Sequence, residues 1–243
     1  MGFADLANPS RFLSLAERAL PWLVVATAAV FAIGLYQALL VAPDDYQQGA
    51  TVKIMFIHVP NAWLAMLCWT VMSIAALGTL VWRHPLADVA AKAAAPLGTA
   101  FTFLCLVTGS LWGRPMWGAY WVWDGRLTSV LVLFLMYLAV LALWRTIEDP
   151  SRAARAVAIL TLVGAINLPI IKFSVDWWAT LHQPASVFRM GAPTIHPAIL
   201  VPLLIMGVAF MLLFVTLHLA AMRNEILRRR VRTLLLMQAQ AGA

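Results

Sequence analysis

The sequence is poor in charge and in cysteine, and it has none of the motifs that bind nucleotides or zinc. Only 11% of its residues are charged. Because it lacks a Walker loop, a GxGxxG loop and a Cys/His cluster of zinc spacing, we expect no ATP hydrolysis by this chain. Its two cysteines, Cys68 and Cys105, both lie in apolar segments, where neither a disulfide nor exposed redox chemistry is expected. No repeat of fixed period is present.

Hydrophobic residues dominate instead, at 63% of the 243 positions, and the mean hydropathy is +0.86. These values are typical of a polytopic membrane protein. A spanning helix needs about 20 apolar residues. The sequence therefore predicts an all-α membrane protein in which residues 1–243 form one transmembrane domain with six spanning helices. The expected spans are approximately 20–41, 59–82, 93–111, 127–144, 156–171 and 195–219.

The formal charge of +7 is distributed unevenly along the chain. With both termini in the cytoplasm, twelve of the seventeen basic residues fall in cytoplasmic segments. The positive-inside rule therefore predicts this orientation, and the charge does not indicate nucleic acid. No cleavable signal peptide is evident in residues 1–19, and Arg11–Leu20 could form a short amphipathic helix at the inner surface.

An aromatic cluster lies between the third and fourth predicted spans, in the stretch Trp112–Ser129. Tryptophan and tyrosine are common at membrane surfaces, so an ordinary aromatic belt is one interpretation. The spacing here matches neither a strand nor a helix face, which predicts an irregular segment that offers flat surfaces to a large apolar ligand. Asp124 is well placed to cap the fourth span. The aromatic residues are Trp112, Trp117, Tyr120, Trp121 and Trp123.

Two histidines are expected on the same outer side as the aromatic cluster. His58 precedes Pro60 at the mouth of the second span, and His182 lies in the long outer loop before the sixth. Heme would use this combination, because its faces are apolar and its iron accepts imidazole nitrogen from both sides. Without a CxxCH motif, the heme would be held non-covalently. Candidate partners for its propionates are Arg114, Arg126 and Arg189.

The remaining histidines are weaker candidates for iron ligands. His196 also lies on the outer side, but its place before Pro197 at a helix start favours a capping role. His84 and His218 are expected at the cytoplasmic side. The sequence therefore favours His58 and His182 as the pair.

The run Trp112-Gly113, Trp117-Gly118, Trp121, Trp123-Asp124 and Arg126-Leu127-Thr128-Ser129 resembles the WWD domain of heme-handling proteins in cytochrome c biogenesis. The length, the six spans and the outer histidines on either side of this run are similar to the heme exporter protein C family of the system I pathway. The resemblance implies that His58 and His182 are the axial ligands of a b-type heme. It also implies that the WWD stretch, with its aromatic residues, Asp124 and Arg126, holds that heme.

The same resemblance implies a location and partners. The chain would lie in the inner membrane of a bacterium, with its heme site on the periplasmic side. It would deliver heme to the chaperone CcmE. Its partners in the membrane would be the small subunit CcmD and the ABC transporter subunits CcmA and CcmB. It would be a transport subunit without ATPase motifs, and enzymatic activity is not expected.

Two other classes of function remain open from the residues alone. A b-type electron-transfer protein would need histidines within its spans, and the six expected spans have none at mid-membrane. A permease would need charges inside the membrane, and the spans contain essentially none. The absorption spectrum of the purified protein separates the heme-handling function from the permease, because a permease would be colourless.

Overall fold

The computed structural model describes residues 8–178 and 180–241, and throughout this part the regular structure is helical. Six of its helical segments are long and apolar enough to cross a membrane, which confirms the predicted six-span protein. The elements are α2 (Pro9–Tyr36), η1 (Gln37–Val41), η2 (Ala50–Ile54), α3 (Met55–Leu80), α4 (Ala87–Trp117), α5 (Gly125–Thr146), α6 (Pro150–Gly164), α7 (Asn167–Trp177) and α8 (Pro197–Ala241).

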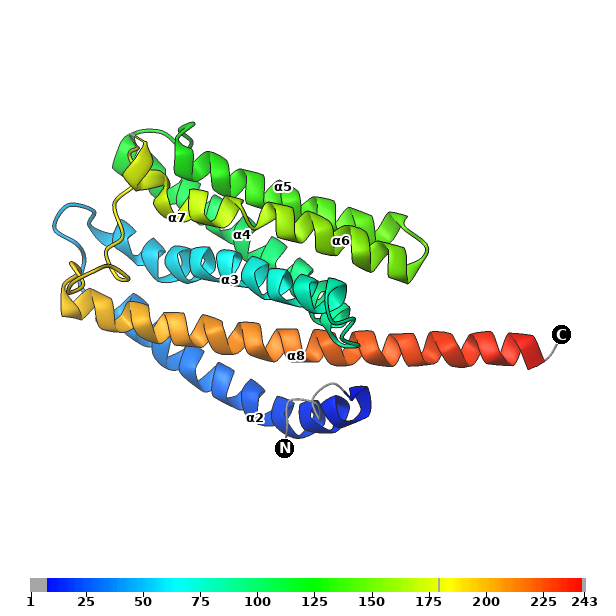
Figure 1. Ribbon diagram of the computed structural model, residues 1–243. Coiled ribbons are helices and arrows are strands. Elements are labelled where there is room, and N and C mark those ends of the chain that lie inside the picture. The colour runs from blue at the N-terminus through cyan, green and yellow to red at the C-terminus, as the bar shows by residue number, and fades with distance from the viewer. Residues whose placement is uncertain (1–7, 179, 242–243) are drawn as a thin grey trace.

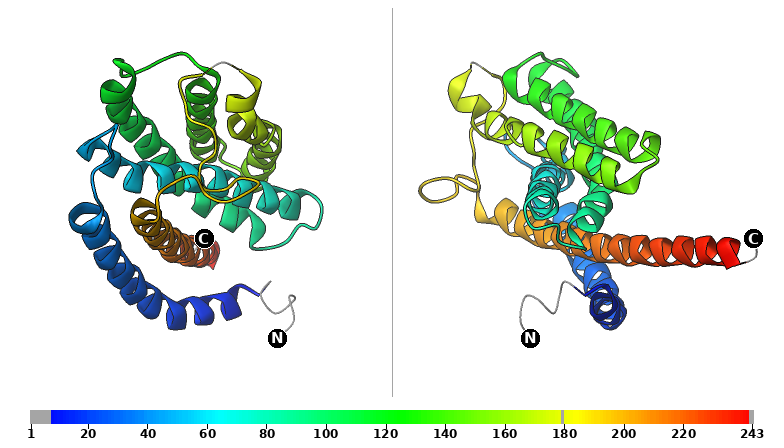
Figure 2. Two further views of the ribbon diagram at one scale, coloured as in Figure 1. Left: turned by 90° about the vertical axis from the view of Figure 1, so that its left-hand side faces the viewer. Right: turned by 45° about the vertical axis from the view of Figure 1, so that its right-hand side comes forward.

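The spanning helices form a bundle with two distinct ends (Figure 1). At the end expected to face outward, called the outer end, lie the segments 42–54 and 118–124, residue 178 and residues 180–196. The start of α2, the end of α8 and the connections 81–86 and 147–149 lie toward the opposite, inner end. Helix α3 is central and packs on α4, α6 and α8, whereas α2 lies at the periphery and packs mainly on α8 (Figure 2).

Two large side chains at the centre of the bundle, Trp69 and Tyr137, are fully buried and hydrogen-bonded through their polar atoms. Trp69 of α3 is fully buried, and its indole Nε1–H donates to the Thr161 carbonyl of α6 over 3.0 Å. Tyr137 of α5 is equally buried and donates its hydroxyl to the Ala65 carbonyl of α3 over 2.7 Å. Because lipid offers no hydrogen-bond partners, such pairing is needed for polar groups at this depth. These two bonds tie α5 and α6 to the central helix.

The helices extend beyond the expected spans. An apolar run indicates only the part of a helix that lies inside lipid, whereas the helix itself begins and ends at its capping residues. Helix α2 begins at Pro9, where the side chain of Asn8 accepts from the Ser10 N–H, so Arg11–Leu20 continues the first span. Helix α6 begins at Pro150, capped by Asp149. Proline at the first helical position after such a residue is a strong start signal. These helices therefore begin before the expected spans, which start at residues 20 and 156.

The fifth and sixth spans also differ from expectation. The predicted interruption near Asn167 is confirmed as a break between α6 and α7, and the Asn167 side chain donates to the Ser129 carbonyl of α5 over 2.9 Å. Helix α8 does not end near residue 219 but runs on to Ala241. Its inner part is held to α4 by ion pairs of Glu225 with Lys92 and of Arg229 with Asp88, at 2.8 and 2.7 Å.

The third span contains the main correction to the sequence analysis. Helix α4 continues to Trp117, so Trp112 and Trp117 lie on a helix and not in an irregular segment. Gly118 ends the helix in the left-handed conformation (φ 76°), which glycine adopts without strain. Only residues 118–124 connect α4 to α5 without helical structure.

Candidate functional site

His58 lies in the first turn of α3 and is only 8% exposed. Its Nδ1 is 3.1 Å from both the Cys105 carbonyl and the Thr108 hydroxyl of α4. The Thr108 hydroxyl already donates to the Leu104 carbonyl, so both groups accept from the imidazole. Nδ1 therefore carries the proton, and Nε2 has a free lone pair. Proteins commonly orient a metal-binding histidine in this way, with a hydrogen bond from the ring nitrogen that does not bind the metal.

Two glycines on one face of α4 leave room for the aromatic rings of the site. A Cβ at Gly109 would lie 2.8 Å from Cε1 of His58. A Cβ at Gly113 would lie 3.1 Å from Cε3 of Trp117 and 3.2 Å from the Ala119 carbonyl. Both contacts are closer than carbon and oxygen atoms normally approach. The outer end of α4 is thus shaped to receive the imidazole and an indole.

Trp112 connects His58 to the first outer segment. Its ring meets the His58 ring edge-to-face with centroids 5.7 Å apart. Its indole Nε1–H donates to the Gln48 amide oxygen over 2.9 Å. The sequence analysis missed Gln48, because nothing in a polar loop before α3 marks it as a partner of a tryptophan 64 residues later.

His182 lies in the segment between α7 and α8 and packs on the other tryptophan of α4. Its ring and that of Trp117 have centroids 5.8 Å apart. Burial, with the Arg126 guanidinium nearby, lowers the pKa of His182 to about 4. The imidazole is therefore neutral near pH 7, as an iron ligand must be. His58 and His182 lie close enough to interact electrostatically and thus form a pair. Each histidine of this pair has one tryptophan of α4 beside it.

The predicted helix-cap role of Asp124 is confirmed. Its Oδ1 accepts from the Leu127 N–H over 2.7 Å at the start of α5. The same carboxylate accepts through Oδ2 from the hydroxyl of Thr180, which lies two residues before His182. Asp124 is only 8% exposed, so both its oxygens act inside the protein.

The candidate cations differ in how they are held. Arg126 donates to the Ser174 hydroxyl (3.3 Å) and the Lys172 carbonyl (3.2 Å) of α7. Arg114 donates to the Gly118 carbonyl and lies over the Tyr120 ring, 5.6 Å from its centroid. Arg189 is exposed in the long segment before α8. Arg126 interacts electrostatically with His182, one histidine of the pair.

The aromatic cluster divides into a buried part and an open part. Trp112, Trp117 and Trp121 are partly buried, whereas Tyr120 and Trp123 are 58% and 74% exposed. Trp121 and Trp123 meet edge-to-face at 5.4 Å. An aromatic belt alone explains Tyr120 and Trp123, but it does not explain tryptophans that pack on histidines.

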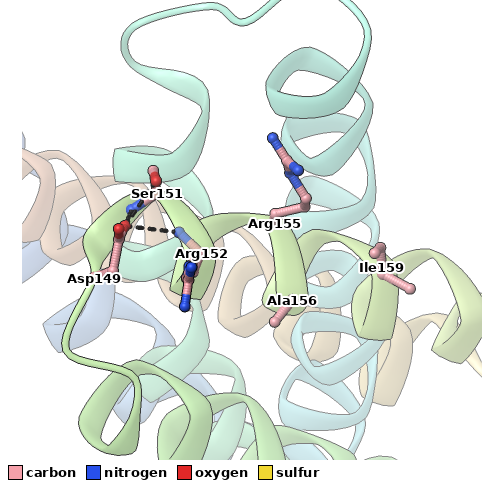
Figure 3. Close-up of a pocket in the computed structure, with 6 residues that line it drawn as sticks. All are labelled: Asp149, Ser151, Arg152, Arg155, Ala156 and Ile159. Carbon is pink, nitrogen blue, oxygen red and sulfur yellow. Dashed lines mark hydrogen bonds between the residues drawn. The ribbon is translucent and has the colours of Figure 1, made fainter.

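Other features of the chain do not belong to this site. His196 accepts from the Ala198 N–H over 3.3 Å at the start of α8, as a capping residue does. His218 stacks on Phe214 and lies about 30 Å along α8 from that start, at 1.5 Å per residue. A hollow of about 440 Å³ at the inner end is lined by α6 (Figure 3). Its polar atoms include the Asp149 cap, which bonds Ser151 and Arg152.

The residues at the outer end fit a heme. Two neutral imidazoles approach from different elements, and among the described residues the buried Nδ1 of His182 and Nε1 of Trp121 have no hydrogen-bond partner. Unpartnered polar atoms of this kind are uncommon in proteins, and a bound ligand is one explanation for them. No group of three or more His, Cys, Asp or Glu side chains suited to a metal ion occurs in the described part of the chain, whereas a six-coordinate heme iron takes two axial ligands.

Comparisons with known proteins show the family of the chain. The family model "Heme exporter protein C" matches residues 2–237. The chain belongs to the heme exporter protein C family. A protein of that name from Bradyrhizobium diazoefficiens is 77% identical over 243 residues, which cover all of this chain and 92% of the relative. The Escherichia coli K12 protein is 46% identical over 92% of this chain and 90% of its own length. The Paracoccus denitrificans protein is 42% identical over 99% and 100%.

Membership of the heme exporter protein C family accounts for the multi-pass membrane architecture and places the chain among proteins named for heme export. The matches extend over nearly the whole chain, including both histidines and the aromatic cluster. The structure adds residues that the sequence analysis did not single out as part of the site. These residues are Gln48, Thr108, Gly109 and Thr180.

Proposed function

We propose that this chain binds one b-type heme non-covalently at its outer end, with His58 and His182 as the axial ligands of the iron. The observation that carries the proposal is the placement of both imidazoles beside the outer end of α4, each against a tryptophan. The bound heme supplies an iron that accepts two imidazole nitrogens and a flat apolar disc that aromatic rings can cover.

The aromatic cluster and the cations would complete the heme site. Trp112, Trp117 and Trp121 would cover the faces of the heme, and Arg126 would hold a propionate. Each buried aromatic ring is worth about 1.5–3 kcal/mol, so three rings suffice to retain an apolar ligand.

The open part of the cluster supports a role in delivery. Tyr120 and Trp123 are exposed and next to the buried rings, where an incoming protein could contact the heme edge. The site would face the periplasm at the inner membrane of a bacterium, since the inner end of the bundle carries most basic residues. The recipient would be the chaperone CcmE. CcmD and the ABC transporter subunits CcmA and CcmB would be the partners in the membrane, and CcmA with CcmB would supply the ATP hydrolysis that this chain lacks the motifs for.

Replacement of the histidines tests the proposal. His58→Ala and His182→Ala each remove one axial ligand, so the purified protein is expected to lose heme or to show a changed ligation state in its absorption and electron paramagnetic resonance spectra. Exogenous imidazole is expected to restore ligation in both variants. His196→Ala is the matched control, because His196 is also at the outer end but caps α8.

Unchanged spectra in either variant would reject that residue as a ligand. A protein that carries two hemes, or a heme that survives both substitutions, would instead support the electron-transfer alternative. Delivery is tested separately by co-purification of CcmE with heme, which is expected to fail for both histidine variants.

A further inference from the structure

The segment that carries His182 has no regular structure of its own. Residues 180–196 connect α7 to α8 without a helix, and most of their side chains are exposed. His182 nevertheless sits partly buried against Trp117. A ligand on such a segment is held in place only if other contacts fix it, because ordering a freely rotating backbone costs conformational entropy.

The two histidines of the site are held in different ways. His58 is oriented through its ring, since Nδ1 donates to the Cys105 carbonyl. The Nδ1 of His182 has no hydrogen-bond partner among the described residues. The Gln183 backbone lies near the His182 ring, and the His182 backbone is itself fixed, because its N–H donates to the Thr180 hydroxyl oxygen over 3.0 Å.

Thr180 is in turn attached to the frame of the bundle. Its hydroxyl donates to Oδ2 of Asp124, whose Oδ1 caps α5 at the Leu127 N–H. A single hydroxyl therefore accepts from the loop and donates to a helix terminus. The chain of bonds from α5 through Asp124 and Thr180 to His182 uses each oxygen in a role that its chemistry allows.

We propose that Thr180 is the positioning residue for the His182 iron ligand, and that Asp124 acts on this ligand through Thr180. The inference rests on the proposed heme ligation and deepens it. Asp124 thus has two functions in one carboxylate, which are the helix cap and the anchor of the ligand loop. Thr180 does for His182, through the backbone, what the Cys105 carbonyl does for His58 through the ring.

The variants that test this role change the hydroxyl and little else. Thr180→Val keeps the shape and removes the hydroxyl, whereas Thr180→Ser keeps the hydroxyl. Thr194→Val is the matched control, because Thr194 lies in the same segment with an exposed side chain. In the heme-bound protein, the measured quantity is the fraction of ferric heme in the low-spin state with two imidazole ligands. In the heme-free protein, it is the rate at which diethylpyrocarbonate modifies His182, followed by mass spectrometry.

For Thr180→Val we expect the detached state of His182 to rise roughly fivefold to tenfold, the change in an equilibrium constant that one hydrogen bond of ordinary strength produces. The high-spin fraction and the modification rate should both increase by that factor, and added imidazole should restore the low-spin state. Thr180→Ser and Thr194→Val should match the wild type. Asp124→Asn combined with Thr180→Val should add less than the two single effects.

Wild-type spectra and modification rates in Thr180→Val would overturn the proposal, provided that His182→Ala has lost the low-spin state. If His182→Ala is itself unchanged, the axial ligation fails and not merely its positioning. Should Thr180→Val not accumulate, Thr180→Ala is measured in its place. Failure of both to accumulate beside a normal Thr180→Ser would assign the hydroxyl to folding and would also overturn the proposal.

Discussion

Gly109 offers a test of whether His58 must occupy the position in which the structure holds it. In Gly109→Ala the new Cβ would lie 2.8 Å from Cε1 and 3.3 Å from Nδ1 of His58. Carbon atoms prefer separations of about 3.5–4.0 Å, so the ring has to move by roughly 0.7 Å or more. The movement takes Nδ1 away from the Cys105 carbonyl, to which it donates over 3.1 Å.

The expected magnitude follows from three terms. Overpacking of this kind costs about 1–3 kcal/mol. Loss of the hydrogen bond costs about 0.5–1.5 kcal/mol. Alanine inside a helix is favoured over glycine by about 0.5–1 kcal/mol, which offsets part of the cost. The three terms sum to about 0.5–4 kcal/mol against the ring position, with a midpoint of about 2 kcal/mol, so heme affinity should fall on the order of tenfold.

Heme titration of the purified protein measures this effect, with thermal unfolding of the heme-free protein alongside. Gly78→Ala is the control, because its Cβ would lie 3.0 Å from the Cβ of Ala87 at the inner end, away from the histidines. Gly78→Ala should bind heme normally. In a His58→Ala background the substitution of Gly109 should have no further effect, since the ring that it displaces is gone.

Two results would refute this reasoning. Normal heme affinity in Gly109→Ala would mean that His58 need not stay against α4 in order to serve the site. A full additional loss in the His58→Ala background would mean that the alanine methyl disturbs something other than the imidazole.

Three further predictions concern the surroundings of the site. Trp112→Phe keeps an aromatic ring against His58 but loses the bond to Gln48, so stability should fall by about 1 kcal/mol in thermal unfolding while heme is retained; loss of heme would show that the indole N–H itself matters. Asp149→Ala should lower the melting temperature at pH 7 with no change in the heme spectrum. Its bonds to Ser151 and Arg152 lower the pKa of Asp149, so the carboxylate stabilises the protein above its unfolded pKa, and the difference between variant and wild type should disappear as the pH falls through the folded pKa. Simultaneous replacement of three tryptophans by Ala should abolish heme transfer yet leave the protein inserted, whereas loss of inserted protein would favour the aromatic belt. These three are Trp117, Trp121 and Trp123.

Much of the fold could be predicted from local signals. The six spans follow from hydropathy, and the cap at Asp124 follows from an acid placed directly before an apolar run. The helix ends were less accurate, because hydropathy reports the part of a helix inside lipid and not the part beyond it. The continuation of α4 through Trp112 and Trp117 was missed because aromatic spacing was taken as irregular, although Gly118 is an ordinary helix stop.

The candidate site was predictable in its residue types but not in its connections. His58, His182 and the tryptophans could be selected because heme requires imidazoles and flat apolar surfaces. Gln48 and Thr180 are common polar loop residues that carry no distinguishing pattern in the sequence. They entered the site only when their hydrogen bonds were seen.

The sequence by itself determined that this is a six-span membrane protein of the heme exporter protein C family, since apolar length and the WWD motif are properties of single segments. Only the tertiary structure decided which ring nitrogen of His58 is free and what holds His182. The contacts responsible join residues 47 and 56 positions apart in the chain. No local pattern encodes such pairs, because they arise when packing of the helices brings α3 against α4 and the segment after α7 against the start of α5.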